Sequence, residues 1–226
     1  MVDSFPAFFQ EVQPIRFLEP LAQTLGALPG EEGLLEYTYA DVVKMAGHAC
    51  PTTAGAYLAC HKALEKLYPG QIPVRGEISI ILYGEADQGV FGVIGQVFSL
   101  LTGAAPTSGF RGLGHKFKRK DLLRFQPPAP ETSGAEGLRF DFRRLNAQKV
   151  VRVDFLPALI PFSPEKAGRT GQLMEKVLWD AARPEEREEF RSLWMEKVRD
   201  MLVEERGIVR WLKIEEIDGS DEGRRE

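Results

Sequence analysis

The side chains best suited to chemistry lie in one short stretch, Gly47-His48-Ala49-Cys50-Pro51. His48 and Cys50 stand two residues apart, so on an extended segment both side chains point to the same side, as two ligands of one metal ion must. Cys50 also precedes a helix that Pro51 is expected to begin, and a helix N-terminus favours a thiolate. The stretch therefore indicates either a metal site or a reactive thiol, with Cys50 and His48 as the catalytic candidates.

Few other residues are available to complete a metal site. The chain has two cysteines and three histidines, which excludes a zinc site of four cysteines, or of three cysteines and one histidine, within one chain. His115 follows a glycine-rich loop and is the candidate for a third metal ligand across space. Glu85 and Asp87 follow a predicted strand and are further candidates, although a solvated loop position is the simpler interpretation for all three residues.

An ordinary structural role is the alternative for the whole motif. In that interpretation Cys50 is a small buried residue at a tight turn, and His48 caps the preceding helix. The remaining pair, Cys60 and His61, lies within the second predicted helix. Cys60 is expected in the core and His61 on the surface.

A basic segment runs from Gly109 to Lys120, in a chain whose formal net charge is -4. Arg111 and Lys116, beside glycines whose amides can form an anion nest, are the candidates for binding a small anionic ligand or cofactor. The spacing matches neither a P-loop nor a dinucleotide-binding motif, so a solvated basic loop is the alternative. Two aromatic residues in one short basic run do not favour nucleic-acid binding.

The composition is typical of a soluble globular protein, with 27% charged and 43% hydrophobic residues. We expect a cytoplasmic protein, because the first residues carry Asp3 where a secretory signal would be basic. The longest apolar run, residues 89–101, is too short to cross a bilayer as a helix. Membrane association is therefore not expected.

Local patterns place the motif between two helices. Thr38 and Asp41 form a capping-box pattern before a helix over 39–46, and Pro51 begins a second helix that ends near Tyr68. Strand patterns follow at 76–83, 138–143 and 149–156, the last two as a hairpin. A buried helix is expected over 89–101, and an N-terminal helix within 5–25.

The chain from Ser163 onward has a helical pattern, with an amphipathic helix starting at Pro184. Packing of this helix on its own core is favoured over binding to a partner. These patterns predict an α+β fold, an antiparallel or mixed sheet packed with helices, with a helical C-terminal extension. The predicted organisation is a core over 1–162, the extension over 163–217 and a disordered tail over 218–226.

The segment from Tyr39 to Phe125 resembles the FmdE family, named after a component of formylmethanofuran dehydrogenase. The resemblance is carried by Asp41-Val42-Val43-Lys44, by Gly47-His48-x-Cys50-Pro51, by the small residues Ala54-Gly55-Ala56 and by Leu101-Thr102-Gly103. It implies an α+β domain, an intertwined homodimer and a metal site at His48 and Cys50. The family's further Cys-x-x-Asp and Thr-Gly-Cys positions are Val93, Gln96 and Ala104 here, and its C-terminal zinc finger is replaced by the helical segment.

Three functions remain open on the sequence alone. The first is a metal-binding protein of FmdE type, in which His48, Cys50 and His115 bind a divalent ion, zinc before nickel or iron, and act on a small anionic ligand in an unspecified reaction. The second is a metal-free redox or nucleophilic protein that uses the Cys50 thiol. The third is a homodimeric assembly module, whose interface is formed by the helix carrying Gly89, Gly92 and Gly95 and by the 190–202 helix.

Overall fold

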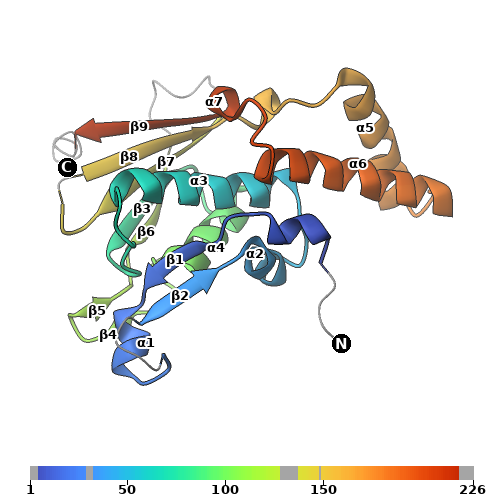
Figure 1. Ribbon diagram of the computed structural model, residues 1–226. Coiled ribbons are helices and arrows are strands. Elements are labelled where there is room, and N and C mark those ends of the chain that lie inside the picture. The colour runs from blue at the N-terminus through green and yellow to red at the C-terminus, as the bar shows by residue number, and fades with distance from the viewer. Residues whose placement is uncertain (1–4, 29–32, 128–136, 148, 219–226) are drawn as a thin grey trace.

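The computed structural model describes residues 5–28, 33–127, 137–147 and 149–218. Its centre is a five-stranded sheet with the strand order β6-β3-β7-β8-β9. The strands span Ile78–Tyr83 (β3), Leu123–Gln126 (β6), Leu138–Arg144 (β7), Lys149–Phe155 (β8) and Leu212–Asp218 (β9). β3 and β6 are parallel, and the other neighbouring pairs are antiparallel. Helices pack against this mixed sheet (Figure 1), which confirms the predicted α+β class.

The two faces of the sheet differ in chemistry because side chains alternate along each strand. On one face the rings of Phe140 and Phe142 are fully buried. On the other face Arg139 pairs with Asp154 across β7 and β8. The predicted hairpin of these two strands is confirmed, with Leu138 opposite Phe155.

Two helices cover the apolar face, α3 (Pro51–Leu67) and α4 (Phe91–Thr102). The ring of Phe98 in α4 packs edge-on against Phe140 and Phe142, with ring centroids 5.1 and 4.9 Å apart. α4 confirms the predicted buried helix. An added Cβ at Gly95 would lie 2.7 Å from the Phe125 ring, so this chain itself covers that part of the glycine-bearing helix.

The N-terminal region departs from the single helix predicted within residues 5–25. It contains a short 3-10 helix (Ala7–Gln10), the strand β1 (Ile15–Leu18) and the helix α1 (Pro20–Thr24). β1 pairs antiparallel with β2 (Leu34–Tyr37) in a two-stranded ribbon. The helix prediction fails here because a proline at 14 and another at 20 disfavour helical backbone before each, while Ile15 and Phe17 alternate into the core.

The C-terminal region contains the helices α5 (Pro164–Leu178), α6 (Pro184–Leu202) and α7 (Ile208–Trp211). α5 and α6 form an antiparallel hairpin that extends beyond the sheet (Figure 1). The last turns of α6 bury Val198, Met201 and Leu202, as expected for packing on its own core. The prediction of helix through residue 217 is wrong, because residues 212–218 form β9 and pair with β8 in the central sheet. Residues 219–226 of the predicted tail lie outside the described residues.

No helix of the described segments has the length and apolar character needed to cross a membrane.

Candidate functional site

The helix α2 (Tyr39–Ala46) leads directly into the His48–Cys50 turn. Its start is fixed by Asp41, whose carboxylate accepts hydrogen bonds from the Thr38 backbone N–H and hydroxyl, both at 2.8 Å. Its end is fixed by Gly47, which adopts a left-handed conformation with φ of 73°. Both helix boundaries match the predicted helix over 39–46. The two caps fix where the chain leaves α2 and enters the His48–Cys50 turn.

His48 is exposed, and its ring is oriented by the backbone. Nδ1 lies 2.9 Å from the carbonyl oxygen of Ala46. Because a carbonyl oxygen only accepts, Nδ1 carries the proton in this hydrogen bond, and the neutral ring keeps a free lone pair on Nε2. Histidines that bind metals are commonly held in this way, with the second ring nitrogen donating to a carbonyl or carboxylate.

Cys50 is the N-cap residue of α3 and is a half-buried free thiol. Its Sγ accepts a hydrogen bond from the Thr53 N–H at 3.5 Å. In return, the Cys50 N–H donates to Thr53 Oγ1 at 3.1 Å. The sulfur therefore lies at the N-terminus of a long helix, where the backbone N–H groups stabilise negative charge.

The turn is held from two sides by residues distant in the sequence. Thr53 is fully buried, and its hydroxyl lies 2.9 Å from the hydroxyl of Tyr39. From the C-terminal helix α6, Trp194 Nε1 donates to the Ala49 carbonyl oxygen at 2.8 Å. The backbone between His48 and Cys50 is thus anchored to both α2 and α6.

The described residues do not complete a metal site within one chain. Among the described residues, no group of three or more His, Cys, Asp or Glu side chains is placed to hold a metal ion. Glu85 and Asp87 are exposed in the loop after β3, consistent with solvated positions. His48 and Cys50 alone supply one nitrogen and one sulfur donor, which leaves further coordination positions to other ligands.

The basic segment forms a small hairpin of β4 (Gly112–Leu113) and β5 (Phe117–Lys118). Arg111, His115 and Lys116 are exposed on it. In Figure 1 the hairpin lies at the lower left beside α1, and the β1–β2 ribbon separates it from α2, so the structure does not bring His115, Arg111 or Lys116 to the His48–Cys50 turn. Arg119 belongs to the same basic segment but is buried. Its guanidinium lies 2.7 Å from the Glu19 carboxylate.

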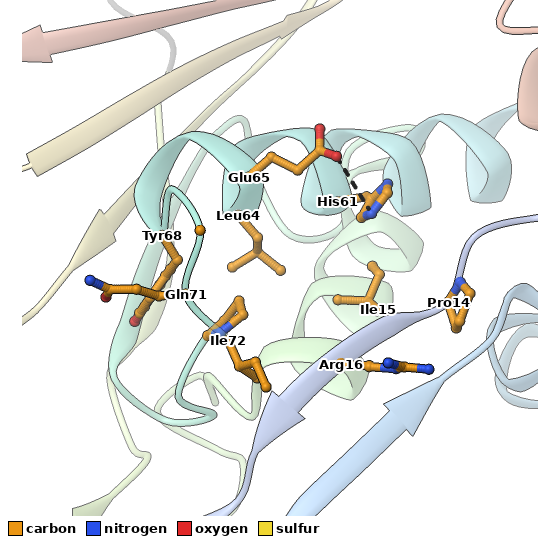
Figure 2. A pocket seen from close by; sticks show the side chains of 11 residues that line it. Pro14, Ile15, Arg16, His61, Leu64, Glu65, Tyr68, Gln71 and Ile72 are labelled. Carbon is orange, nitrogen blue, oxygen red and sulfur yellow. Dashed lines mark ion pairs between the residues drawn. The ribbon is translucent and has the colours of Figure 1, made fainter.

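The second cysteine–histidine pair gives one correct prediction and one error. Cys60 is fully buried, as expected, and burial raises the pKa of its thiol. His61 is not a surface residue, because only 14% of its side chain is exposed. Burial, partly offset by the carboxylate of Glu65, lowers the pKa of His61. His61 lies beside the N-terminal segment (Figure 2), whose residues 11–16 line two cavities together with it, and no local pattern in the sequence indicated that neighbour.

No model of a known protein family matches this chain, and no curated protein matches it. The FmdE resemblance therefore stays a prediction based on the motif residues.

Proposed function

We propose that the protein is a cytoplasmic metal-binding protein of FmdE type, in which His48 and Cys50 hold one divalent ion, zinc before nickel or iron. The observation that carries the proposal is the local hydrogen bonding of the two donors. The Ala46 carbonyl accepts a hydrogen bond from Nδ1 and so leaves His48 Nε2 free, and Cys50 Sγ lies at the start of α3, where it accepts a hydrogen bond from the Thr53 N–H. A nitrogen and a sulfur donor together suit zinc, and imidazole also accepts nickel or iron.

The proposal requires ligands beyond these two. A homodimer would provide them by bringing a donor from a second copy to the exposed His48, and a bound small molecule or water would fill the remaining positions. A zinc ion with an open position polarises a carbonyl group or lowers the pKa of bound water to near neutrality. The reaction stays open. A small anionic ligand at Arg111 and Lys116 would bind apart from the metal within one chain.

Metal analysis of variants tests the proposal. The protein is purified without added metal, and zinc, nickel and iron per chain are measured for wild type, Cys50→Ser and His48→Ala. His115→Ala is the matched control, because this histidine is also exposed but lies on the β4–β5 hairpin. We expect one ion per chain in wild type and in the control, and loss of most of it in the two site variants.

Two other results have clear meanings. Loss of metal in His115→Ala as well would show that a second copy carries His115 to the His48–Cys50 pair. Equal metal content in wild type, Cys50→Ser and His48→Ala would contradict the proposal. In that case, alkylation of metal-free protein tests the thiol alternative, with the buried Cys60 as the unreactive internal reference.

A further inference from the structure

The β4–β5 hairpin and the residue region just before it expose two large apolar side chains. Phe110 is 61% exposed and Leu113 is 53% exposed. The hairpin lies at one end of the molecule, at the lower left of Figure 1 and below the central sheet. Apolar side chains scattered singly over a surface are ordinary, but two on one short projecting hairpin form a local apolar tip.

The same segment carries positive charge in a chain that is acidic as a whole. Residues 109–120 include five basic residues and no acidic residue, whereas the net charge of the chain is -4. Arg111, Lys116 and Lys118 are exposed. None of these three side chains forms an ion pair with a carboxylate of the described residues. The exposed part of the hairpin is therefore both cationic and apolar.

The base of the hairpin is fixed to the body of the protein. Arg119 is buried, and its guanidinium lies 2.7 Å from the carboxylate of Glu19 at the start of α1. The Arg119 N–H donates to the Arg111 carbonyl oxygen at 3.1 Å. The two strands approach closely at Gly112, where an added Cβ would lie 1.9 Å from the Phe117 carbonyl oxygen. The exposed side chains thus project from a hairpin with a defined support.

We propose that this hairpin binds the surface of a membrane that contains anionic lipids. Arg111, Lys116 and Lys118 contact the headgroup phosphates, while Phe110 and Leu113 enter the boundary between headgroups and acyl chains. Basic side chains are attracted to the negative surface of such a membrane, and exposed apolar side chains leave water there. The proposal departs from the sequence-based expectation of no membrane association. That expectation was based on the absence of a spanning segment, which peripheral binding does not need.

Other anionic partners fit the hairpin less well. Single-stranded nucleic acid stacks its bases on aromatic rings, but Leu113 is aliphatic, and the half-buried Phe117 ring has Lys116 Nζ 5.2 Å from its centroid. An acidic protein would need about 800 Å² of complementary surface, of which strands of two residues each supply only a small part. A free anion would gain nothing from Phe110. A bilayer uses both features, because its headgroups are anionic and its interior is apolar.

The inference rests on the proposed function only in taking Arg111 and Lys116 as anion-binding residues, and it names the class of that anion. It does not require a metal ion at His48 and Cys50. All vesicle measurements are therefore made in the presence of a chelator, so that the membrane proposal and the metal proposal can fail independently.

Sedimentation of the full chain with lipid vesicles tests the proposal. Binding is measured to phosphatidylcholine vesicles and to vesicles of equimolar phosphatidylcholine and phosphatidylglycerol, at about 0.1 M and about 1 M salt. One double variant removes charge from the hairpin, and the other removes its apolar side chains: Lys116→Gln with Lys118→Gln, and Phe110→Ser with Leu113→Ser.

The chain offers a matched control for each double variant. The charge control changes two exposed basic residues far along the chain, Arg210→Gln with Lys213→Gln. The apolar control changes two side chains at the end of α5 that are 76% and 78% exposed, Leu178→Ser with Trp179→Ser.

We expect wild type and both controls to bind the mixed vesicles at about 0.1 M salt, with affinity about tenfold higher than for phosphatidylcholine alone, and to lose most binding at about 1 M salt. Each hairpin variant should bind the mixed vesicles about tenfold more weakly than wild type. Single-stranded polyuridylate should bind wild type more weakly than the mixed vesicles do.

Several results would overturn the proposal. One is a wild-type protein that binds neither kind of vesicle, or both kinds equally. Another is a loss of binding in the controls as large as in the hairpin variants. Weaker binding of the lysine variant alone would leave a purely electrostatic contact and overturn insertion of Phe110 and Leu113. Tighter binding to polyuridylate than to the mixed vesicles would assign the hairpin to nucleic acid.

Discussion

Replacing Thr53 by valine tests how the His48–Cys50 turn is held in place. The Thr53 hydroxyl accepts from the Cys50 N–H at 3.1 Å, donates to the Cys50 carbonyl at 3.0 Å and contacts the Tyr39 hydroxyl at 2.9 Å. Since the threonine proton is used on the carbonyl, Tyr39 is the donor in the third contact. Valine has nearly the same shape, so the change removes hydrogen bonds and creates little cavity.

The expected cost follows from which groups lose their partners. Tyr39 is fully buried, so its unpaired hydroxyl costs about 1–3 kcal/mol. Cys50 is half-buried, so water replaces part of its lost hydrogen bond, at a cost of about 0.5–1.5 kcal/mol. We therefore expect Thr53→Val to lower the free energy of unfolding by about 2–4 kcal/mol, and Tyr39→Phe by about 1 kcal/mol.

Urea denaturation of wild type, both single variants and the double variant measures this coupling. In the Tyr39→Phe background no tyrosine hydroxyl is left unpaired, so Thr53→Val should cost about 1–2 kcal/mol less than in wild type. Metal affinity should fall in Thr53→Val, because Cys50 loses its reciprocal hydrogen bond, and should change little in Tyr39→Phe. Strictly additive effects, or a Thr53→Val cost below about 0.5 kcal/mol, would refute the assigned hydrogen bonding.

Three further tests follow from the structure. Glu19→Ala leaves two arginines without their shared buried carboxylate and should lower the free energy of unfolding by about 3–5 kcal/mol in urea denaturation; a cost below about 1 kcal/mol would contradict the pairing. Gly55→Ala places a Cβ 2.2 Å from a phenylalanine ring on β8 and should destabilise by about 1–3 kcal/mol, whereas Gly171→Ala, with open space around it, should stabilise slightly. Because burial lowers the folded-state pKa of His61, the unfolded state takes up the proton first as pH falls below about 6.5, so stability should decrease there. His61→Gln should flatten this pH dependence of unfolding, and an unchanged dependence would count against the burial.

Local signals in the sequence predicted the helices that frame the candidate site. Thr38 and Asp41 start α2, Gly47 ends it and Pro51 starts α3, each through contacts within a few residues. The same local signals identified the β7–β8 hairpin. Such elements are predictable because the residues that determine their ends are neighbours in the chain.

Elements that depend on distant partners were missed. β1 and β2 are four-residue strands that exist through their pairing with each other. β9 is a strand because it meets the edge of β8, although its sequence continues a helical region. His61 likewise lies beside the N-terminal segment, and no periodicity in the sequence of α3 indicates that neighbour.

The candidate site was only partly predictable for the same reason. The pairing of His48 with Cys50 follows from their spacing. Their support by Trp194, whose indole binds a backbone carbonyl 145 residues earlier in the chain, does not. The separation of His115 from the pair is also a property of the whole fold, since it depends on where the β4–β5 hairpin projects.

X-ray absorption at the zinc edge of the protein loaded with one equivalent of zinc tests the central claim most directly. We predict a sulfur neighbour at about 2.3 Å and nitrogen or oxygen neighbours at about 2.0–2.1 Å. The sulfur shell should vanish in Cys50→Ser, and the imidazole contribution should fall in His48→Ala. A wild-type spectrum without sulfur, identical to that of Cys50→Ser, would contradict the assignment of His48 and Cys50 as a metal-binding pair.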